Sequence, residues 1–343
     1  DVYKRQAAGS PASYYGKENF GNKTDGKSPL AAVPGLEKYH GTDTFLSEAL
    51  TIEAMKALDD AQQTDKPFFL YMAHYAIHTP IQPDMRFYQK YLDKGLPPVE
   101  AAYATLIEGM DKSLGDIMDY LDKNNLTENT ILIFMSDNGG LAAHTRAGQL
   151  HVQNYPLNSG KGSAYEGGIR EPMIVRWPGR IPAGSVSNQL MSNVDMLATL
   201  AALTGYELQE QDGPDSFNML PALIGNPGKM IRDHIIICPS QKSHLSIRKG
   251  KWVYIPAQNS GGFTGKNVGD HDLGGASAFQ LTHRVNSDIE NARIKPDAPS
   301  VQLYNLEEDP YQTTNVYEQH PKVARRLARI LEEKIRKSDA TRK

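Results

Sequence analysis

The stretch TILIFMSDNGG, residues 130–140, decides the fold class, because it joins an apolar strand to a polar turn. Residues 130–135 form a continuous apolar run of strand length, which is typical of a strand covered on both faces. Asp137 and Asn138 follow at once, and two glycines after them permit a sharp backbone turn. Ligands of open α/β sheets bind beyond the carboxyl ends of the strands, so this turn is the first candidate site.

Working outward, the same kind of apolar run recurs between segments of helical periodicity. We expect further buried strands at 68–73, 174–177 and 235–238. Apolar residues three or four apart predict helices at about 43–63, 98–123 and 194–204. This alternation of strands and helices predicts an α/β fold with a mostly parallel sheet sandwiched by helices.

The pattern changes towards the C-terminus. Residues 245–255, with a glycine at their centre, predict a β-hairpin, and 303–306 predict another short strand. A last amphipathic helix is expected at about 321–337. We therefore expect a small C-terminal antiparallel sheet covered by one helix. The predicted domains are a partial α/β catalytic domain at 1–235 and an α+β subdomain at 236–343.

Composition narrows the class of protein. The chain has 343 residues, of which 39% are hydrophobic and 22% charged, as in an ordinary globular protein. The formal net charge of −3 gives no strong field towards nucleic acid, and no apolar run approaches the roughly 20 residues that span a bilayer. A single cysteine, Cys238, excludes an internal disulfide framework, and we expect it to be buried within its apolar run.

A histidine follows the predicted strand at 68–73. His78 stands before Thr79-Pro80 at the strand end, where a proton donor for catalysis is well placed. His74 is the weaker candidate because it lies closer to the strand body. The alternative for either residue is an ordinary surface or packing histidine.

The third element is the segment GKGSAYEGGIREP, residues 160–172. Lys161 lies between glycines, so its ammonium group and nearby amides are able to surround an oxyanion. A phosphate loop is not predicted, because Tyr155 stands where its first glycine belongs. Glu166 and Arg170 are four residues apart and are expected to pair with each other.

Taken together, these loops predict a proton donor, a cation site and an anion clamp, a combination that suits a doubly charged tetrahedral ester. Asp137 and Asn138 offer two oxygen ligands to a hard cation, although the same residues also make plain Asx-Gly turns. His78 and Lys161 supply the other two functions.

At this point the residues resemble the type I, formylglycine-dependent sulfatases, an arylsulfatase-like family of the alkaline phosphatase-like superfamily. Residues 68–80 look like the family's strand and His-x-Pro turn, and 136–140 like its metal-binding loop. Residues 160–179 are similar to its Gly-Lys-Gly…Tyr-Glu-Gly-Gly-Ile-Arg…Pro signature, and 303–310 to the start of its C-terminal subdomain. The resemblance extends over nearly all of residues 40–335.

The resemblance implies an alkaline phosphatase-like fold and a sulfuric ester hydrolase that acts on a sulfated carbohydrate or an aryl sulfate. It makes Asp137 and Asn138 ligands of one Ca²⁺, with further ligands missing from this sequence. It makes Lys161 a sulfate-binding residue, and His78 both a sulfate-binding residue and the donor of a proton to the leaving alcohol. The family's nucleophile is a formylglycine, made from the first residue of a Cys/Ser-x-Pro-x-Arg motif.

The sequence lacks three features of the family. No Cys/Ser-x-Pro-x-Arg motif occurs in it, and the family's N-terminal Asp pair and second Lys/His pair are also missing. We expect all of these, with the formylglycine, to lie upstream of Asp1. We therefore expect the 343 residues alone to be inactive, and any signal for a periplasmic or secreted location to lie upstream too.

Two alternatives stay open: a sulfated-glycan-binding pseudo-enzyme, and a phosphoesterase of the same superfamily. Asn138 suits one hard cation better than two zinc ions, which counts against the phosphoesterase. Within the sulfatase interpretation, the polar loop 141–158 is expected to bind sugar hydroxyls or further sulfates through His144 and Arg146, unless it is simply solvated. A sulfated saccharide or other sulfate ester is thus the expected partner, and the oligomeric state is left open.

Overall fold

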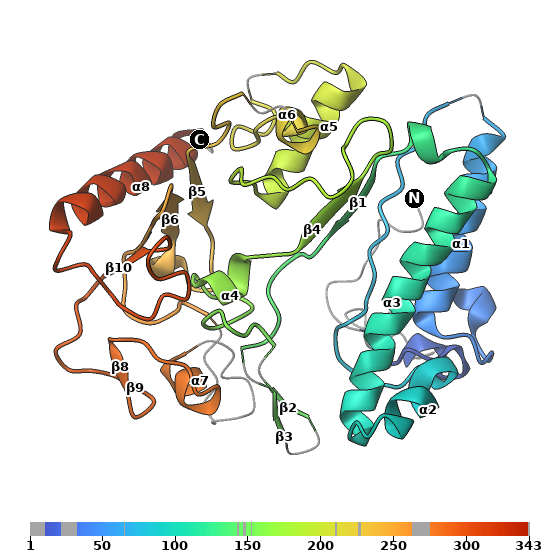
Figure 1. Ribbon diagram of the computed structural model, residues 1–343, viewed down its shortest axis with the longest axis horizontal. Helices are drawn as coiled ribbons and strands as arrows, with labels where there is room; N and C mark the ends of the chain where they lie inside the picture. Colours follow the sequence, from blue (N-terminus) through green and yellow to red (C-terminus); the bar gives the residue numbers. More distant parts are fainter. Residues whose placement is uncertain are drawn as a thin grey trace. The chain divides into compact units, whose positions relative to one another are not determined.

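The computed structural model describes residues 11–21, 33–64, 66–142, 144–146, 149–151, 153–209, 211–225, 228–262 and 275–341, with the backbone alone at 144–146, 149–151 and 338–341. The chain divides into two compact units, residues 1–130 and 131–343, and each is described by itself. Figure 1 labels their helices and strands. No helix within these described ranges is long and apolar enough to cross a membrane.

The first unit is built from helices. Its longer helices, which pack side by side in Figure 1, are α1 (Leu46–Gln62) and α3 (Pro98–Lys123). The limits of α3 are those that the sequence predicts, and α1 begins within three residues of the expected start. Helix α2 (Met85–Asp93) was not predicted; the Asp84 side chain caps it by accepting a hydrogen bond from Arg86 N at 3.1 Å. Short 3-10 turns are η2 (Gly16–Gly21), η4 (Glu37–Tyr39) and η5 (Thr127–Asn129).

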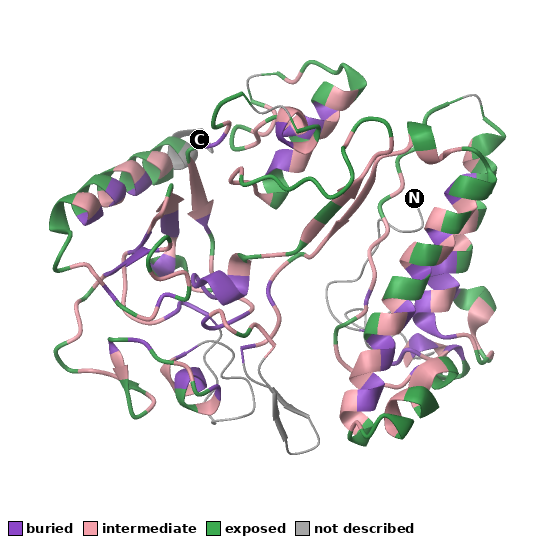
Figure 2. Ribbon diagram, viewed as in Figure 1, coloured by how far each residue is buried: buried purple, intermediate pink, exposed green. Residues whose placement is uncertain are grey.

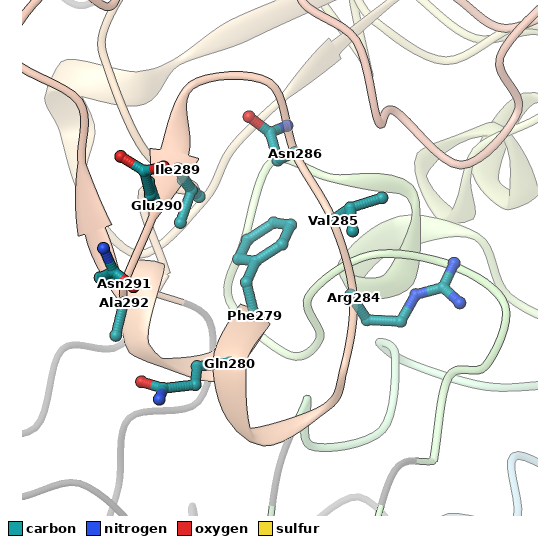
Figure 3. A pocket seen from close by; sticks show the side chains of 9 residues that line it. All are labelled: Phe279, Gln280, Arg284, Val285, Asn286, Ile289, Glu290, Asn291 and Ala292. Carbon is teal, nitrogen blue, oxygen red and sulfur yellow. The ribbon is translucent and has the colours of Figure 1, made fainter.

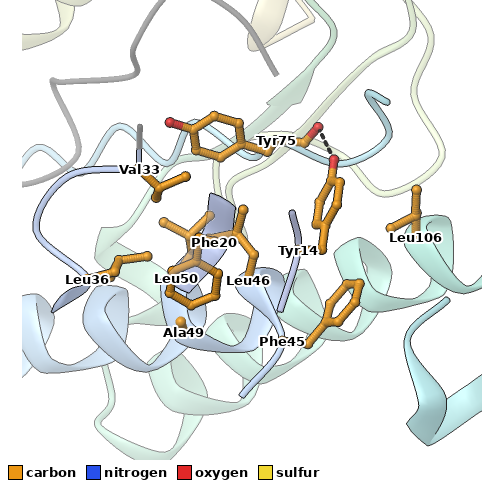
Figure 4. Close-up of a cluster of buried hydrophobic side chains, with 10 residues drawn as sticks. All are labelled: Tyr14, Phe20, Val33, Leu36, Phe45, Leu46, Ala49, Leu50, Tyr75 and Leu106. Carbon is orange, nitrogen blue, oxygen red and sulfur yellow. Dashed lines mark hydrogen bonds between the residues drawn. The ribbon is translucent and has the colours of Figure 1, made fainter. Parts of the chain in front are cut away.

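A buried apolar cluster joins the N-terminal turns of this unit to its helices. Figure 4 shows Tyr14, Phe20, Phe45 and Leu46 packed together with residues of α1 and with Leu106 of α3. The rings of Tyr14 and Phe45 are stacked, with centroids 5.4 Å apart. Residues before α1, which carry no helical or strand periodicity, therefore take part in the core.

The strand predicted at 68–73 is not formed: these residues lie outside every strand of the described part. Leu70 and Met72 pack against Ala54, Ile117 and Leu121 of the helices, whereas Phe69 and Tyr71 are 75% and 63% exposed. The alternation of a strand is present. A ladder also needs a neighbouring backbone with which to exchange hydrogen bonds, and the apolar pattern alone does not supply one.

The second unit begins with strand β1 (Leu132–Met135), which lies within the predicted strand 130–135. It pairs with β4 (Met173–Arg176), which overlaps the strand predicted at 174–177. The pairing is antiparallel, with Leu132 opposite Arg176, and every other strand pair of the described residues is antiparallel too. The helices and sheets agree with the α/β class, but the parallel pairing that we expected is absent from the described strands. An apolar run reports burial and carries no information on strand direction.

The C-terminal sheet agrees with the prediction. Its strands follow the order β10-β7-β6-β5, all antiparallel: β5 (His234–Ile237), β6 (Ser246–Lys249), β7 (Trp252–Ile255) and β10 (Gln302–Asn305). The β6–β7 hairpin turns at Gly250, whose φ of +56° favours glycine. Helix α8 (Pro321–Thr341) covers one face. Strand β5 belongs to this sheet, and the domain boundary between residues 235 and 236 stays a prediction.

Side chains alternate between the two faces of this sheet. Ile247, Tyr254 and Leu303 meet Leu327 of α8 on one face. Val253, Ile255 and Tyr304 meet Tyr165 on the other, so the segment predicted to bind an anion closes the second face of the sheet. Figure 2 shows buried residues gathered in these strands. The two-residue alternation along each strand therefore determines which side chains pack against α8 and which pack against Tyr165.

Shorter elements complete the unit: β2 (His144–Arg146), β3 (Gln149–His151), α4 (Glu166–Ile169), η6 (Asn193–Asp195), α5 (Met196–Thr204), α6 (Leu220–Leu223), η7 (Lys242–His244), α7 (Ala276–Leu281), β8 (Ile289–Glu290) and β9 (Arg293–Ile294). Helix α5 ends at Thr204, as predicted, and Gly205 after it lies in the left-handed region. Ser192 and Asp195 form a capping box at the start of η6, the turn before this helix. Asp195 also pairs with the buried Arg232, so it is structural.

Cys238 is exposed, which corrects the expectation that it is buried. Strand β5 ends at Ile237, whose side chain is only 4% exposed. Cys238 is the next residue along the chain, so it lies past the last strand residue, outside the covered part of the sheet.

Candidate active site

Strand β1 delivers the turn 136–140 to the site. Ser136 Oγ donates to Asn138 O at 3.0 Å, and Asn138 Nδ2 donates to Gly139 O at 3.1 Å, which fixes the turn and directs the amide nitrogen to the backbone. Asp137 is exposed. Within the described ranges no donor bonds to the Asp137 carboxylate or to Asn138 Oδ1. Acceptor oxygens left without donors fit a hard cation, for which they supply two of the six to eight ligands that calcium takes.

Glycines bring the Lys161 segment against this turn. Lys161 N donates to Gly140 O at 2.9 Å, and Gly139 N donates to Gly168 O at 3.1 Å. A Cβ atom at Gly139 would lie 1.9 Å from Gly167 O, and one at Gly160 would lie 2.4 Å from Gly140 O. The backbones approach so closely that no larger residue fits. The structure therefore brings Asp137, Asn138 and Lys161 onto two adjoining loops.

Polar side chains that the sequence analysis did not assign to this task hold the two loops together. Asn154 Nδ2 donates to Gly140 O at 2.8 Å and to Ser159 O at 2.9 Å, so this amide serves the backbone rather than a sugar. Asn158 is fully buried; its side-chain Nδ2 donates to Gln312 O at 3.2 Å, and its backbone carbonyl accepts from Gly167 N at 3.0 Å. Gln312 Oε1 accepts from Glu166 N at 2.6 Å. Buried amides satisfy loop backbone in this way, but sequence spacing gives no signal for it.

The signature segment is anchored beneath the C-terminal sheet. Tyr165 is 1% exposed, and its hydroxyl donates to Gln302 Oε1 at 2.5 Å. Burial raises the pKa of Tyr165, which keeps this hydroxyl a donor. Glu166 lies 3.8 Å from Arg170, as predicted, and 3.4 Å from Arg248 of β6, while burial raises the pKa of its carboxyl.

Glu171 adds a carboxyl group near the cation turn. Burial raises the pKa of Glu171 to about 7, the negative charge of Asp137 adds to that rise, and a hydrogen bond with Ser136 opposes it. Its Oε1 atom is buried without a hydrogen-bond partner among the described residues. No group of three or more His, Cys, Asp or Glu side chains suited to a metal is found in the described part of the chain.

His78 lies in the first unit, on the turn that follows residues 66–73. Tyr14 Oη donates to Tyr75 O at 2.7 Å and to His78 O at 2.9 Å; Figure 4 shows the first of these bonds. His78 is exposed, with Nδ1 placed 3.1 Å from Thr79 O. Thr79 Oγ1 lies 3.2 Å from the same nitrogen, so both contacts of the ring are made at Nδ1. Burial lowers the pKa of His74 to about 4, so His74 is neutral near pH 7.

The structure places His144 and Arg146 on β2, which pairs with β3 through His144 opposite His151. Their side chains lie outside the described residues, so their proposed contact with substrate stays a prediction. The same holds for the roles assigned to Asp137, Asn138, Lys161 and His78.

Comparison with known proteins defines the family. The family model described as "Sulfatase" matches residues 2–206. The chain belongs to the sulfatase family.

Individual relatives agree. An N-acetylgalactosamine-6-O-sulfatase of Bacteroides thetaiotaomicron is 32% identical over 296 residues, covering 84% of this chain and 51% of that protein. A solved structure from work on glycosaminoglycan metabolism by the same species ("BT33336S-sulf") has a TM-score of 0.63 and 29% identity over 85% of this chain and 56% of that one. A crystal structure of Ps i-CgsB in complex with k-i-k-neocarrahexaose has a TM-score of 0.64 and 25% identity, covering 95% of this chain and 64% of that one.

These matches confirm the predicted family, and with it the alkaline phosphatase-like α/β fold that its members share. The chain spans about half the length of the first curated relative that it matches.

Proposed function

We propose that the protein of which this chain forms part is a sulfuric ester hydrolase that removes sulfate from a sulfated saccharide. A 6-sulfated N-acetylgalactosamine residue is the first candidate substrate, because the relative with 32% identity is named for that bond. The observation that supports the proposal is the pair of backbone bonds, Lys161 N to Gly140 O and Gly139 N to Gly168 O, which hold the Lys161 loop against the turn that carries Asp137 and Asn138.

The residues divide the work as follows. Asp137 and Asn138 hold one Ca²⁺, which supplies positive charge to the sulfate oxygens when it is bound. Lys161 binds the sulfate with its ammonium group. His78 gives a proton to the leaving sugar oxygen, which lowers the cost of releasing an alkoxide.

The nucleophile is a separate matter, since residues 1–343 contain no Cys/Ser-x-Pro-x-Arg motif. We propose that a formylglycine from the rest of the protein supplies it and that the 343 residues alone do not turn over substrate. Glycan sulfates are extracellular compounds, so we also propose a periplasmic or secreted location.

Sulfate release tests the proposal. The coding sequence upstream of Asp1 is determined first, and the longer protein is then assayed on N-acetylgalactosamine 6-sulfate with calcium. We expect turnover by the longer protein and none by the 343-residue chain. Lys161→Ala or His78→Ala should lower kcat/KM by roughly 10²- to 10³-fold, whereas Lys242→Ala, at an exposed lysine, should leave it unchanged. Turnover by the short chain contradicts the assignment of the nucleophile. Saturable binding without product from either form favours a sulfated-glycan-binding protein.

A further inference from the structure

Two exposed tyrosines flank an arginine next to the Lys161 segment. The guanidinium carbon of Arg284 lies 5.0 Å from the ring centre of Tyr155 and 5.9 Å from that of Tyr311. Tyr155 is 73% exposed and Tyr311 is 39% exposed. The three residues come from segments far apart in the sequence. We call Tyr155, Arg284 and Tyr311 the aromatic platform.

Hydrogen bonds fix the platform. Arg284 Nε donates to Asn158 Oδ1 at 3.3 Å, and Nη2 donates to Pro156 O. Asn158 Nδ2 donates in turn to Val285 O and to Gln312 O, both at 3.2 Å. Asn158 therefore ties together all three segments. Among the described residues no acceptor bonds to Nη1 of Arg284, which leaves that edge of the guanidinium for a ligand.

The platform is also fixed relative to Lys161, within the same unit. Asn158 precedes Lys161 by three residues, so their Cα atoms are at most about 11 Å apart. The carbonyl of Asn158 accepts from Gly167 N at 3.0 Å, and a Cβ atom at Gly167 would lie 2.4 Å from that oxygen. A ligand on the platform thus lies a short, constant distance from a sulfate held by Lys161.

The exposed tyrosine rings of the platform suit a sugar, because they offer apolar faces to a saccharide ring. Arg284 also borders a hollow of about 300 Å³, lined by Phe279, Gln280, Val285, Asn291 and others. Its side chain points away from Phe279 and Ile289 (Figure 3), so the guanidinium is directed away from that hollow and towards the tyrosines. Arg284 adds a planar cation that stacks on aromatic rings and pairs with a carboxylate or sulfate.

We propose that the aromatic platform is a subsite for a second sugar residue, one bearing an anionic group, of the chain whose sulfate Lys161 holds. The proposal rests on the proposed function and extends it: the substrate is an oligosaccharide or polymer rather than a monosaccharide. The tyrosine faces carry the ring, and Arg284 carries the anionic group.

Calorimetric binding to the longer protein, with its nucleophile replaced by alanine, in calcium tests this. The probes are N-acetylgalactosamine 6-sulfate and a chondroitin 6-sulfate tetrasaccharide. We expect the tetrasaccharide to bind about tenfold more tightly, and Tyr155→Ala to remove about that factor without changing monosaccharide binding. Tyr155→Phe should retain it. Tyr206→Ala, at a tyrosine that is 64% exposed elsewhere in the unit, is the matched control and should have no effect.

The outcomes separate the two proposals. Monosaccharide binding with no gain for the tetrasaccharide, or with no effect of Tyr155→Ala, overturns the platform and leaves the proposed function standing. Failure of both probes to bind contradicts both. Arg284→Gln should weaken binding of the tetrasaccharide but not of the monosaccharide.

Modified tetrasaccharides identify the anionic group that Arg284 binds. One form has its carboxyl groups reduced, and another lacks the sulfates other than the one held by Lys161. If a tetrasaccharide without either kind of group binds with unchanged affinity, the role of Arg284 is overturned.

Discussion

The strand pair β1–β4 and the C-terminal sheet β10-β7-β6-β5 are both made of apolar runs, but they are buried very differently. Every residue of β10 is buried, as are three of the four residues of β7, whereas no residue of β1 or β4 is. Ile174 of β4 is 66% exposed. Figure 2 makes the contrast visible.

The difference lies in what covers each face. The C-terminal sheet has α8 on one side and Tyr165 on the other, both supplied by residues of this unit. The β1–β4 pair lacks such cover in the described residues, although its sequence is that of a strand buried on both faces. We infer that the C-terminal sheet holds most of the folding energy of the second unit, and that the β1–β4 pair contributes the loops.

The largest expected effect comes from the point where the two regions meet. Gly139→Ala places a methyl group 1.9 Å from Gly167 O, so the backbone must move. We expect a loss of about 3–5 kcal/mol in the free energy of unfolding, measured by urea denaturation. Gly115→Ala in α3, where an added Cβ meets nothing within 4 Å, should instead stabilise by up to about 1 kcal/mol. Equal effects would show that the two loops are not in contact.

Truncating one side chain in the C-terminal sheet and one in the β1–β4 pair tests whether the two regions differ in packing. Leu327→Ala removes a fully buried side chain under the C-terminal sheet and should cost about 3 kcal/mol. Ile174→Ala should cost less than about 1 kcal/mol, because the side chain is already in water. A similar loss from both, in the same urea titration, would mean that the β1–β4 pair is as well packed as the sheet.

The hydroxyl of Tyr165 joins the Lys161 segment to the C-terminal sheet, and removing it tests how much this bond contributes to stability. Tyr165→Phe deletes the hydrogen bond to Gln302 Oε1, which still accepts from Tyr304 at 2.6 Å. Because no acceptor is left unpaired, we expect a cost of only about 1 kcal/mol, seen as a lower midpoint in urea with an unchanged slope. A cost several times larger would show that the hydroxyl positions the loop rather than merely joining it to the sheet.

The exposed apolar face should also drive association. Ile174→Lys is expected to change the free energy of unfolding by no more than about 0.5 kcal/mol and to increase the monomeric fraction on gel filtration, because a charge on an exposed strand opposes edge-to-edge pairing. Arg180→Ala, at an exposed residue beyond β4, is the control. A wild-type chain that is monomeric at all concentrations contradicts the expectation.

The smallest effect concerns pH. Burial raises the pKa of Glu166 in the folded chain above that of the unfolded chain. The folded state therefore binds more protons between the two values, and this contribution to stability is present below the unfolded pKa and lost as pH rises through the folded one. Glu166→Gln should remove that dependence. The unfolding midpoint of the variant, relative to that of the wild type, should therefore increase as pH rises from 4 to 7. A constant difference across this range would contradict the sign.

The sequence predicts the local elements well and the long-range arrangement less well. Helix α3 and the β6–β7 hairpin follow from periodicity and a glycine, which act over a few residues. The direction of β4, and whether residues 68–73 join a strand, depend on which backbone lies alongside, and apolar content does not encode that. Within the candidate site, Asp137 and Asn138 could be proposed from the sequence because they follow a strand directly, and Lys161 because glycines flank it. Asn158 and Gln312 were missed, because a buried amide that bonds to a distant loop has no local pattern.

Binding of N-acetylgalactosamine 6-sulfate to the longer protein, with its nucleophile replaced by alanine, in the presence and absence of calcium tests the central claim most directly. The account predicts saturable, calcium-dependent binding that Lys161→Ala weakens at least tenfold while the unfolding midpoint stays the same. Binding that is indifferent to calcium and to Lys161 would contradict it.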